Sequence, residues 1–199
     1  MGEPAYTRLQ VDERRRQLLD AGADLFTRHA YDELSMAKIA RAVGISKALL
    51  YHYFPSKQAY FQATLEQAAA ELTETIQPDP DLPPVEQLAR SLDAYLGWIE
   101  RNADAYAKLI AGVGAVPAVR ELVERVRTET ADRIIAGISP GGAKPPLRAA
   151  VRGWMWFMDG AIMDWIEHRD FERARLQGLL LGTLLGAVTA SGEPVDVSG

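Results

Sequence analysis

Four residues that suit contacts with nucleic acid fall together on one side of a short helix predicted over residues 46–53. They are Lys47, Ala48, Tyr51 and His52. Leu50 and Phe54, spaced four apart, lie on the opposite side and are expected to face a core. Lys47 and Ala48 occupy the N-terminal turn, the part of such a helix that usually reaches base edges. The spacing therefore predicts a face that contacts DNA.

The segment around this helix has the pattern of a helix-turn-helix. Residues 36–54 read MAKIARAVGISKALLYHYF, and Ala40 is small at a point where two helices must cross closely. Gly44 follows in the turn, where a left-handed backbone is free of steric cost for glycine. Ile45 then fills the corner and Ser46 is a good N-cap for the next helix. The second helix of this motif enters the major groove.

Two flanking residues extend the predicted DNA face. Ser35 caps the helix before the turn, where its hydroxyl and free backbone N–H groups suit a phosphate. Lys57 starts the following helix and is positioned for another phosphate. The net charge of −5 divides unevenly, because residues 1–57 hold nine Lys or Arg against seven Asp or Glu. The basic excess coincides with the motif, but it is too modest to decide a function alone.

From Arg16 to about Leu65 the chain resembles the DNA-binding domain of the TetR family of bacterial regulators. The matching stretches read LLDAGADLF, YDELSMAKIARAVGIS and LLYHYFPSKQAY. The resemblance implies that Tyr51 and Lys57 contact phosphates. It also implies contacts with backbone or bases from Ser35, Lys47, Ala48, Leu49 and His52, and we add Ser46 to this predicted set. Many relatives carry Gly-Thr where this chain has Ala48-Leu49, and leucine cannot donate a hydrogen bond. Leu49 therefore either meets a thymine methyl group or belongs to the core.

The predicted fold is all-α, since no segment shows sustained alternation of apolar and polar residues. Helical spacing predicts nine helices over residues 11–28, 35–42, 46–53, 57–76, 84–101, 103–113, 117–137, 146–168 and 171–190. We expect three parts: a helix-turn-helix domain over 1–56, a helical effector-binding and dimerisation domain over 57–191, and a disordered tail over 192–199.

The last two predicted helices carry a dimerisation pattern. The first is apolar almost all round and so must be buried on two sides, and the second repeats glycine every fourth residue. The spacing alone predicts a closely packed pair, and a close contact within one subunit remains the alternative. The resemblance implies a four-helix dimer interface. The candidate interface residues are Gly153, Gly160, Asp164, Gly178, Gly182, Leu185 and Gly186.

Large aromatic and sulfur-containing side chains in the C-terminal half suit a cavity for a small hydrophobic or aromatic molecule. The candidates are Tyr95, Trp98, Tyr106, Met155, Trp156, Phe157 and Met163. The alternative is that these side chains only pack the core. On the same helix, Asp159 lies on one face with Arg152, and we expect the two to pair.

Catalysis has little support in the sequence. The chain has no cysteine, no glycine-rich phosphate loop and only three scattered histidines, so we expect no enzyme activity, no cofactor and no metal site. The longest apolar stretch, 176–190, is shorter than the ~20 residues that cross a bilayer, and the Arg-rich N-terminus has no secretory pattern. A cytoplasmic protein without membrane contact is expected.

We therefore expect a homodimer that binds a pseudo-palindromic, double-stranded operator and is released by a small-molecule effector. Repression is the expected direction, because it is the usual one in the family that the chain resembles. One rival interpretation is a helical dimer that binds small molecules or proteins without specific DNA binding. Another is an all-α enzyme, which would need an acid–base pair that the sequence does not offer.

Overall fold

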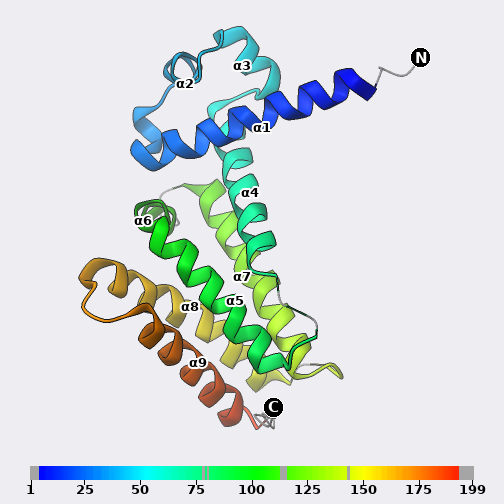
Figure 1. The fold of residues 1–199 in the computed structure, drawn as a ribbon, viewed down its shortest axis with the longest axis vertical. Helices are drawn as coiled ribbons and strands as arrows, with labels where there is room; N and C mark the ends of the chain where they lie inside the picture. The colour runs from blue at the N-terminus through cyan, green and yellow to red at the C-terminus, as the bar shows by residue number, and fades with distance from the viewer. Residues whose placement is uncertain (1–4, 78, 80, 113–115, 143, 193–199) are drawn as a thin grey trace. The chain divides into compact units, whose positions relative to one another are not determined.

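The structure, a computed structural model, describes residues 5–77, 79, 81–112, 116–142 and 144–192 (Figure 1). These residues form nine α-helices and one 3-10 turn, with no strand among them. In chain order the elements are α1 (Ala5–Arg28), η1 (Tyr31–Glu33), α2 (Met36–Ala42), α3 (Lys47–Tyr53), α4 (Lys57–Thr75), α5 (Pro84–Arg101), α6 (Ala103–Gly112), α7 (Pro117–Ile138), α8 (Pro145–His168) and α9 (Arg173–Ala190). The all-α prediction is confirmed.

The chain divides into two compact units, Met1–Glu71 and Leu72–Gly199, and the division falls inside α4. The predicted boundary between residues 56 and 57 lies at the start of that same helix. Of the predicted C-terminal tail, all but Gly192 lies outside the described residues. None of the described helices is long and apolar enough to cross a membrane.

A glycine-dependent turn joins α2 to α3 in the N-terminal unit. Gly44 has φ +72°, a left-handed value that glycine adopts without a Cβ clash. The Gly44 amide donates to the Arg41 carbonyl at 3.3 Å, and the Ile45 amide donates to the Ala40 carbonyl at 3.0 Å. This pair of bonds is the Schellman motif, which ends α2 and redirects the chain into α3.

The first half of α4 belongs to the core of the N-terminal unit. Tyr60 is fully buried and its hydroxyl donates to the Leu18 carbonyl of α1 at 2.5 Å. The Phe54 and Tyr60 rings meet edge to face with centroids 4.8 Å apart. Gly22 makes this packing possible, because a Cβ there would lie 2.6 Å from the Tyr60 hydroxyl and from Thr64 Oγ1. Burial raises the pKa of the Tyr60 hydroxyl, so it remains protonated and keeps its hydrogen bond.

In the C-terminal unit α8 is the central helix. It packs against α6, α7 and α9, and α9 also packs against α5 (Figure 1). One apolar stripe of α8 is buried, and it consists of Trp154, Met158, Ile162 and Trp165. Two indoles of this stripe also hydrogen-bond to the backbone: Trp154 Nε1 donates to the Leu180 carbonyl at 2.9 Å, and Trp165 Nε1 donates to the Phe171 carbonyl at 2.8 Å. These bonds fix α9 and its preceding loop on α8.

Two predictions about local structure were wrong. The first helix begins at Ala5 rather than at residue 11, since residues 5–10 contain no glycine or proline to stop it. Asp159 does not pair with Arg152, because Asp159 is buried against Arg127 of α7. Arg152 lies at the surface, with Nη2 3.7 Å from Asp132 Oδ1. A spacing of seven on one helix places two residues on one face, but it does not show which neighbouring helix supplies a partner.

Candidate nucleic-acid interface

The outward face of α3 presents all the side chains predicted for it. Lys47, Ala48 and His52 are exposed, and Tyr51 is 43% exposed. Leu50, by contrast, has no exposed surface. The Lys47 amine lies 5.7 Å from the centre of the Tyr51 ring, so a cation and a phenol stand side by side on the same face. Such a face can donate hydrogen bonds to phosphate oxygens and to base edges.

Serine caps hold the first turns of α2 and α3. Ser35 Oγ accepts from the Lys38 amide at 3.3 Å, and Ser46 Oγ accepts from the Leu49 amide at 3.1 Å. Both serines are exposed. Each capping bond satisfies one of the backbone donors that a helix N-terminus leaves free, and the remaining donors carry the positive end of the helix dipole. Both helices therefore begin in an environment favourable to a phosphate.

Lys57 makes contacts that the sequence did not indicate. It is half-buried, and its amine donates to the Tyr31 carbonyl of η1 at 2.9 Å. The same amine lies 3.9 Å from the centre of the Tyr31 ring, a cation–π distance. Burial raises the pKa of the Tyr31 hydroxyl, and the negative charge of Asp32 raises it by a smaller amount. Lys57 thus ties the start of α4 to η1. Tyr31 is 26 residues away along the chain, beyond any local sequence signal.

The candidate effector residues separate into two groups. Tyr106 and Met155 are buried in the core of the C-terminal unit, and Tyr95, Trp98 and Met163 pack against it half-buried. Trp156 and Phe157, in contrast, lie on the exposed side of α8 and are 60% and 42% exposed. The structure therefore brings five of the seven residues around one core and leaves two at the surface.

A buried charged network lies beside those five residues. Arg127 and Asp159 are each only 8% exposed. Asp159 accepts hydrogen bonds from the Arg127 guanidinium, with Nε at 2.9 Å, and from the Tyr106 hydroxyl at 2.9 Å. Burial alone would lower the pKa of Arg127, but its hydrogen bonds to Asp159 and Glu124 outweigh burial and raise it. The Arg127 guanidinium also lies 4.1 Å from the centre of the Trp156 ring, so the network reaches the exposed side of α8.

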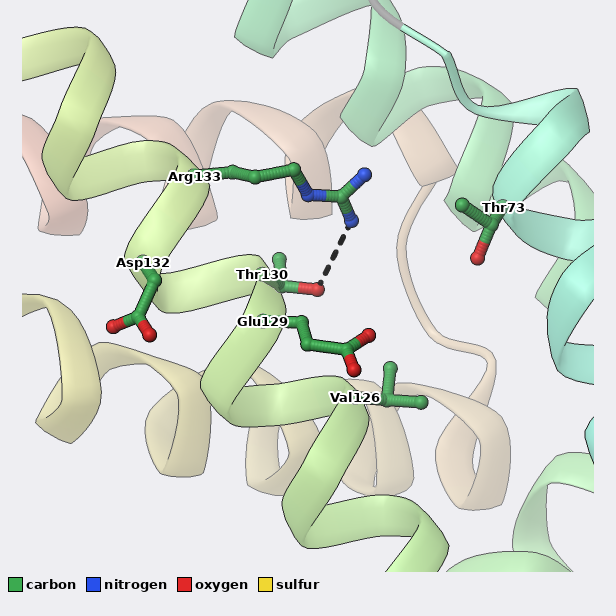
Figure 2. A pocket seen from close by; sticks show the side chains of 6 residues that line it. All are labelled: Thr73, Val126, Glu129, Thr130, Asp132 and Arg133. Carbon is green, nitrogen blue, oxygen red and sulfur yellow. Dashed lines mark hydrogen bonds between the residues drawn. The ribbon is translucent and has the colours of Figure 1, made fainter.

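Surface grooves lie along α7 and α9 in the described part of the C-terminal unit. One, of about 430 Å³, is lined by Thr73 at the end of α4 and by α7 residues Val126, Glu129, Thr130, Asp132 and Arg133 (Figure 2). Along its α7 side, Arg133 donates to Thr130 Oγ1 at 3.4 Å. The other, of about 340 Å³, lies on α9 along Arg175, Gly178, Leu179, Gly182 and Thr183. None of the candidate effector residues lines either groove.

The glycines that were predicted to meet another helix lie on the outward side of α8 and α9, where their backbone is accessible. All five candidate interface glycines are exposed. A Cβ added at any of them would meet no described atom within 4 Å, and the five are Gly153, Gly160, Gly178, Gly182 and Gly186. The other two candidate interface residues are Asp164 of α8, which is exposed, and Leu185 of α9, which is half-buried. A contact among the residues that the structure describes therefore does not account for these glycines.

Two family models match the chain. The model described as "Bacterial regulatory proteins, tetR family" matches residues 18–64, which contain α2, α3 and the buried half of α4. The model described as "Tetracyclin repressor-like, C-terminal domain" matches residues 84–186, more than half of the chain.

Individual relatives are regulators as well. The HTH-type transcriptional activator FasR of Mycolicibacterium smegmatis is 31% identical over 107 residues, which are 53% of this chain and 49% of FasR. The nucleoid occlusion factor SlmA of Haemophilus influenzae is 35% identical over 74 residues, 37% of this chain and 34% of SlmA. The chain thus spans between a third and a half of the length of these relatives. A tetR-family transcriptional regulator from Streptomyces coelicolor has a crystal structure that matches with a TM-score of 0.79 at 28% identity, over 96% of this chain and 84% of that one.

Proposed function

Because the chain belongs to the TetR family of bacterial regulatory proteins, which are DNA-binding regulators and not enzymes, we propose that it represses transcription as a homodimer on a pseudo-palindromic operator. Each protomer places α3 in the major groove, and phosphate contacts on both sides of the groove supply affinity. One relative is described as an activator, so a reporter assay with the operator upstream of a promoter is needed to determine the direction of regulation.

The observation that carries this proposal is the two-sided character of α3. Leu50 is completely buried, whereas Lys47, Tyr51 and His52 are exposed around the rest of the helix. Because the apolar side of this seven-residue helix packs on the core, only the remaining surface of the helix is free to contact a partner. That side combines donors for phosphate and base edges with a small residue, Ala48, that permits close approach.

Selection of duplexes from a random DNA pool at near-physiological salt will enrich an inverted repeat. Tyr51→Ala will weaken binding to every duplex by about tenfold per half-site, the value of one hydrogen bond to a charged group. Tyr51→Phe, which keeps the ring and removes only the hydroxyl, will show most of this loss. Absence of enrichment by a folded, dimeric protein would favour the alternative, a binding module without specific DNA recognition.

The dimer proposal is supported by the outward side of α8 and α9. Five exposed glycines on these two helices leave the backbone accessible, and Trp156, Phe157 and Leu179 are large apolar side chains left 60%, 42% and 46% exposed. Glycine inside a helix lowers stability by about 1 kcal/mol relative to alanine, so a column of glycines needs a compensating contact. A second copy of α8 and α9, laid against this side, would provide it.

Gly182→Arg will convert the dimer to a monomer at micromolar concentration, as measured by sedimentation velocity. The added side chain meets nothing in its own chain, so the helical content measured by circular dichroism will stay unchanged. Gly137→Arg is the matched control, since Gly137 is also exposed in a helix with open space around it. A Gly182→Arg protein that remains dimeric would place the interface elsewhere.

For the effector, we propose a small hydrophobic or aromatic molecule held by the five residues that lie in or on the C-terminal core: Tyr95, Trp98, Tyr106, Met155 and Met163. Such a molecule releases DNA only to the extent that it binds the DNA-free conformation more tightly. A compound library tested for thermal stabilisation, followed by DNA release, identifies candidates. Replacing Met163 with alanine should weaken binding of an authentic effector without altering DNA affinity in its absence.

A further inference from the structure

Leu49 is an aliphatic side chain that the core of the N-terminal unit does not use. It is 38% exposed, whereas the adjacent Leu50 is completely buried. Six half-buried apolar residues pack against that core, and Leu49 is not among them: they are Leu25, Phe26, Val43, Ile45, Tyr53 and Ala63. The sequence left open whether Leu49 belongs to the core or to the outward face, and the structure places it on the outward face.

Its position is the one from which a helix reaches base edges. The Leu49 amide donates to Ser46 Oγ, the N-cap of α3, so Leu49 lies in the first turn. Around the helix axis, Ala48, Leu49 and His52 surround the direction opposite to Leu50 and Phe54. A helix docked in the major groove contacts bases mainly with this N-terminal turn.

Only one feature of the major groove matches an aliphatic side chain. All four bases present hydrogen-bonding groups there, and thymine alone adds a methyl group, at its C5. A leucine placed against a donor or acceptor of a base would displace the water bound to that group without replacing the hydrogen bond, which is unfavourable. Leucine against the methyl group buries apolar surface on both partners.

We propose that Leu49 determines sequence preference by contacting the 5-methyl group of a thymine in each half-site. The assignment rests on the proposed function, since it names the base feature that the operator-binding face of α3 recognises. It predicts a thymine at a fixed position of each half-site, within the base pairs that the first turn of α3 covers.

The test removes the methyl group from the DNA and, separately, its partner from the protein. Deoxyuridine replaces each thymine of the selected operator in turn, which deletes the methyl group and keeps every hydrogen-bonding group. Wild-type affinity, measured by fluorescence anisotropy, should fall about fourfold at one thymine per half-site, because ~0.8 kcal/mol for one buried methyl group corresponds to that factor in an equilibrium constant at 25 °C. Leu49→Ala should bind the thymine operator with a similar loss and show no further loss with deoxyuridine.

Val11→Ala is the matched control, because Val11 is an aliphatic residue of α1 that is 44% exposed and lies outside α3. It should keep the full response to deoxyuridine. In a repeated selection, Leu49→Ala should lose the preference for thymine at that position and keep the preferences at the others. If no duplex is enriched by the wild type, the proposed function and this assignment both fail. If an operator is found but deoxyuridine has no effect, or acts equally on Leu49→Ala, only the assignment of Leu49 fails.

Discussion

Asp159→Ala will lower the free energy of unfolding of the C-terminal unit by about 3–5 kcal/mol, the usual range when one partner of a buried ion pair is removed. The substitution leaves the Arg127 guanidinium at 8% exposure without its main counter-charge and removes the acceptor of the Tyr106 hydroxyl. Urea unfolding followed by tryptophan fluorescence reports this unit directly, because the chain's four Trp all lie in α5 and α8.

Two further variants separate the network from an ordinary ion pair. Arg152→Ala breaks a pair whose side chains are half-exposed, Nη2 lying 3.7 Å from Asp132 Oδ1, and it should change stability by less than about 1 kcal/mol. Arg127→Met combined with Asp159→Leu and Tyr106→Phe removes the buried ion pair and the hydroxyl bonded to it, leaving only the half-exposed carboxylate of Glu124, and it should recover most of the loss. A loss below about 1 kcal/mol for Asp159→Ala would mean that water reaches Arg127 and that the pair is not buried in solution.

Gly22→Ala will destabilise the N-terminal unit by about 1–3 kcal/mol, the range for inserting a methyl group into a filled core. The new Cβ would lie 2.6 Å from the Tyr60 hydroxyl and 2.8 Å from Cζ of the same ring. Tyr60 cannot easily yield, because it is fully buried and its hydroxyl is bonded to the Leu18 carbonyl. Thermal unfolding by far-ultraviolet circular dichroism, together with DNA affinity, measures the effect.

The control for this substitution is Gly137→Ala. Gly137 is exposed near the end of α7 and has open space where a Cβ would stand. Alanine there should stabilise the protein by up to about 1 kcal/mol, from helix propensity alone. Should Gly22→Ala behave like Gly137→Ala, then α1 and α4 are packed less closely than the structure indicates.

Local signals made the helix-turn-helix predictable from the sequence. Gly44 and Ser46 act on backbone within a few residues of themselves, and the structure shows the left-handed turn and the capping bond that those residue types favour. Helical spacing likewise predicted all nine α-helices in the described part of the chain, with ends that differ by two residues or fewer except at the start of α1.

Contacts between helices were not predictable in the same way. The partner of Asp159 was expected on its own helix and lies 32 residues earlier, on α7. Lys57 was expected to be free for a phosphate, and its amine is held by the carbonyl and ring of Tyr31. Periodicity shows which side of a helix is apolar, but the identity of the neighbour depends on packing that no short sequence window contains. Whether Lys57 also reaches a phosphate in the DNA complex stays a prediction.

The five exposed glycines on the outward side of α8 and α9 restrict how this surface can change by mutation. The five glycine positions can change only by gaining volume, and open space around each of them means that the gain leaves the fold of the chain intact. If two copies meet through this side, a single glycine-to-larger change adds volume on both protomers of a homodimer and on only one protomer of a pair with an unchanged copy. Such a change disfavours the changed homodimer more than the mixed dimer, so separate homodimers of two sister regulators would also need a compensating loss of volume on the same side of α8 and α9.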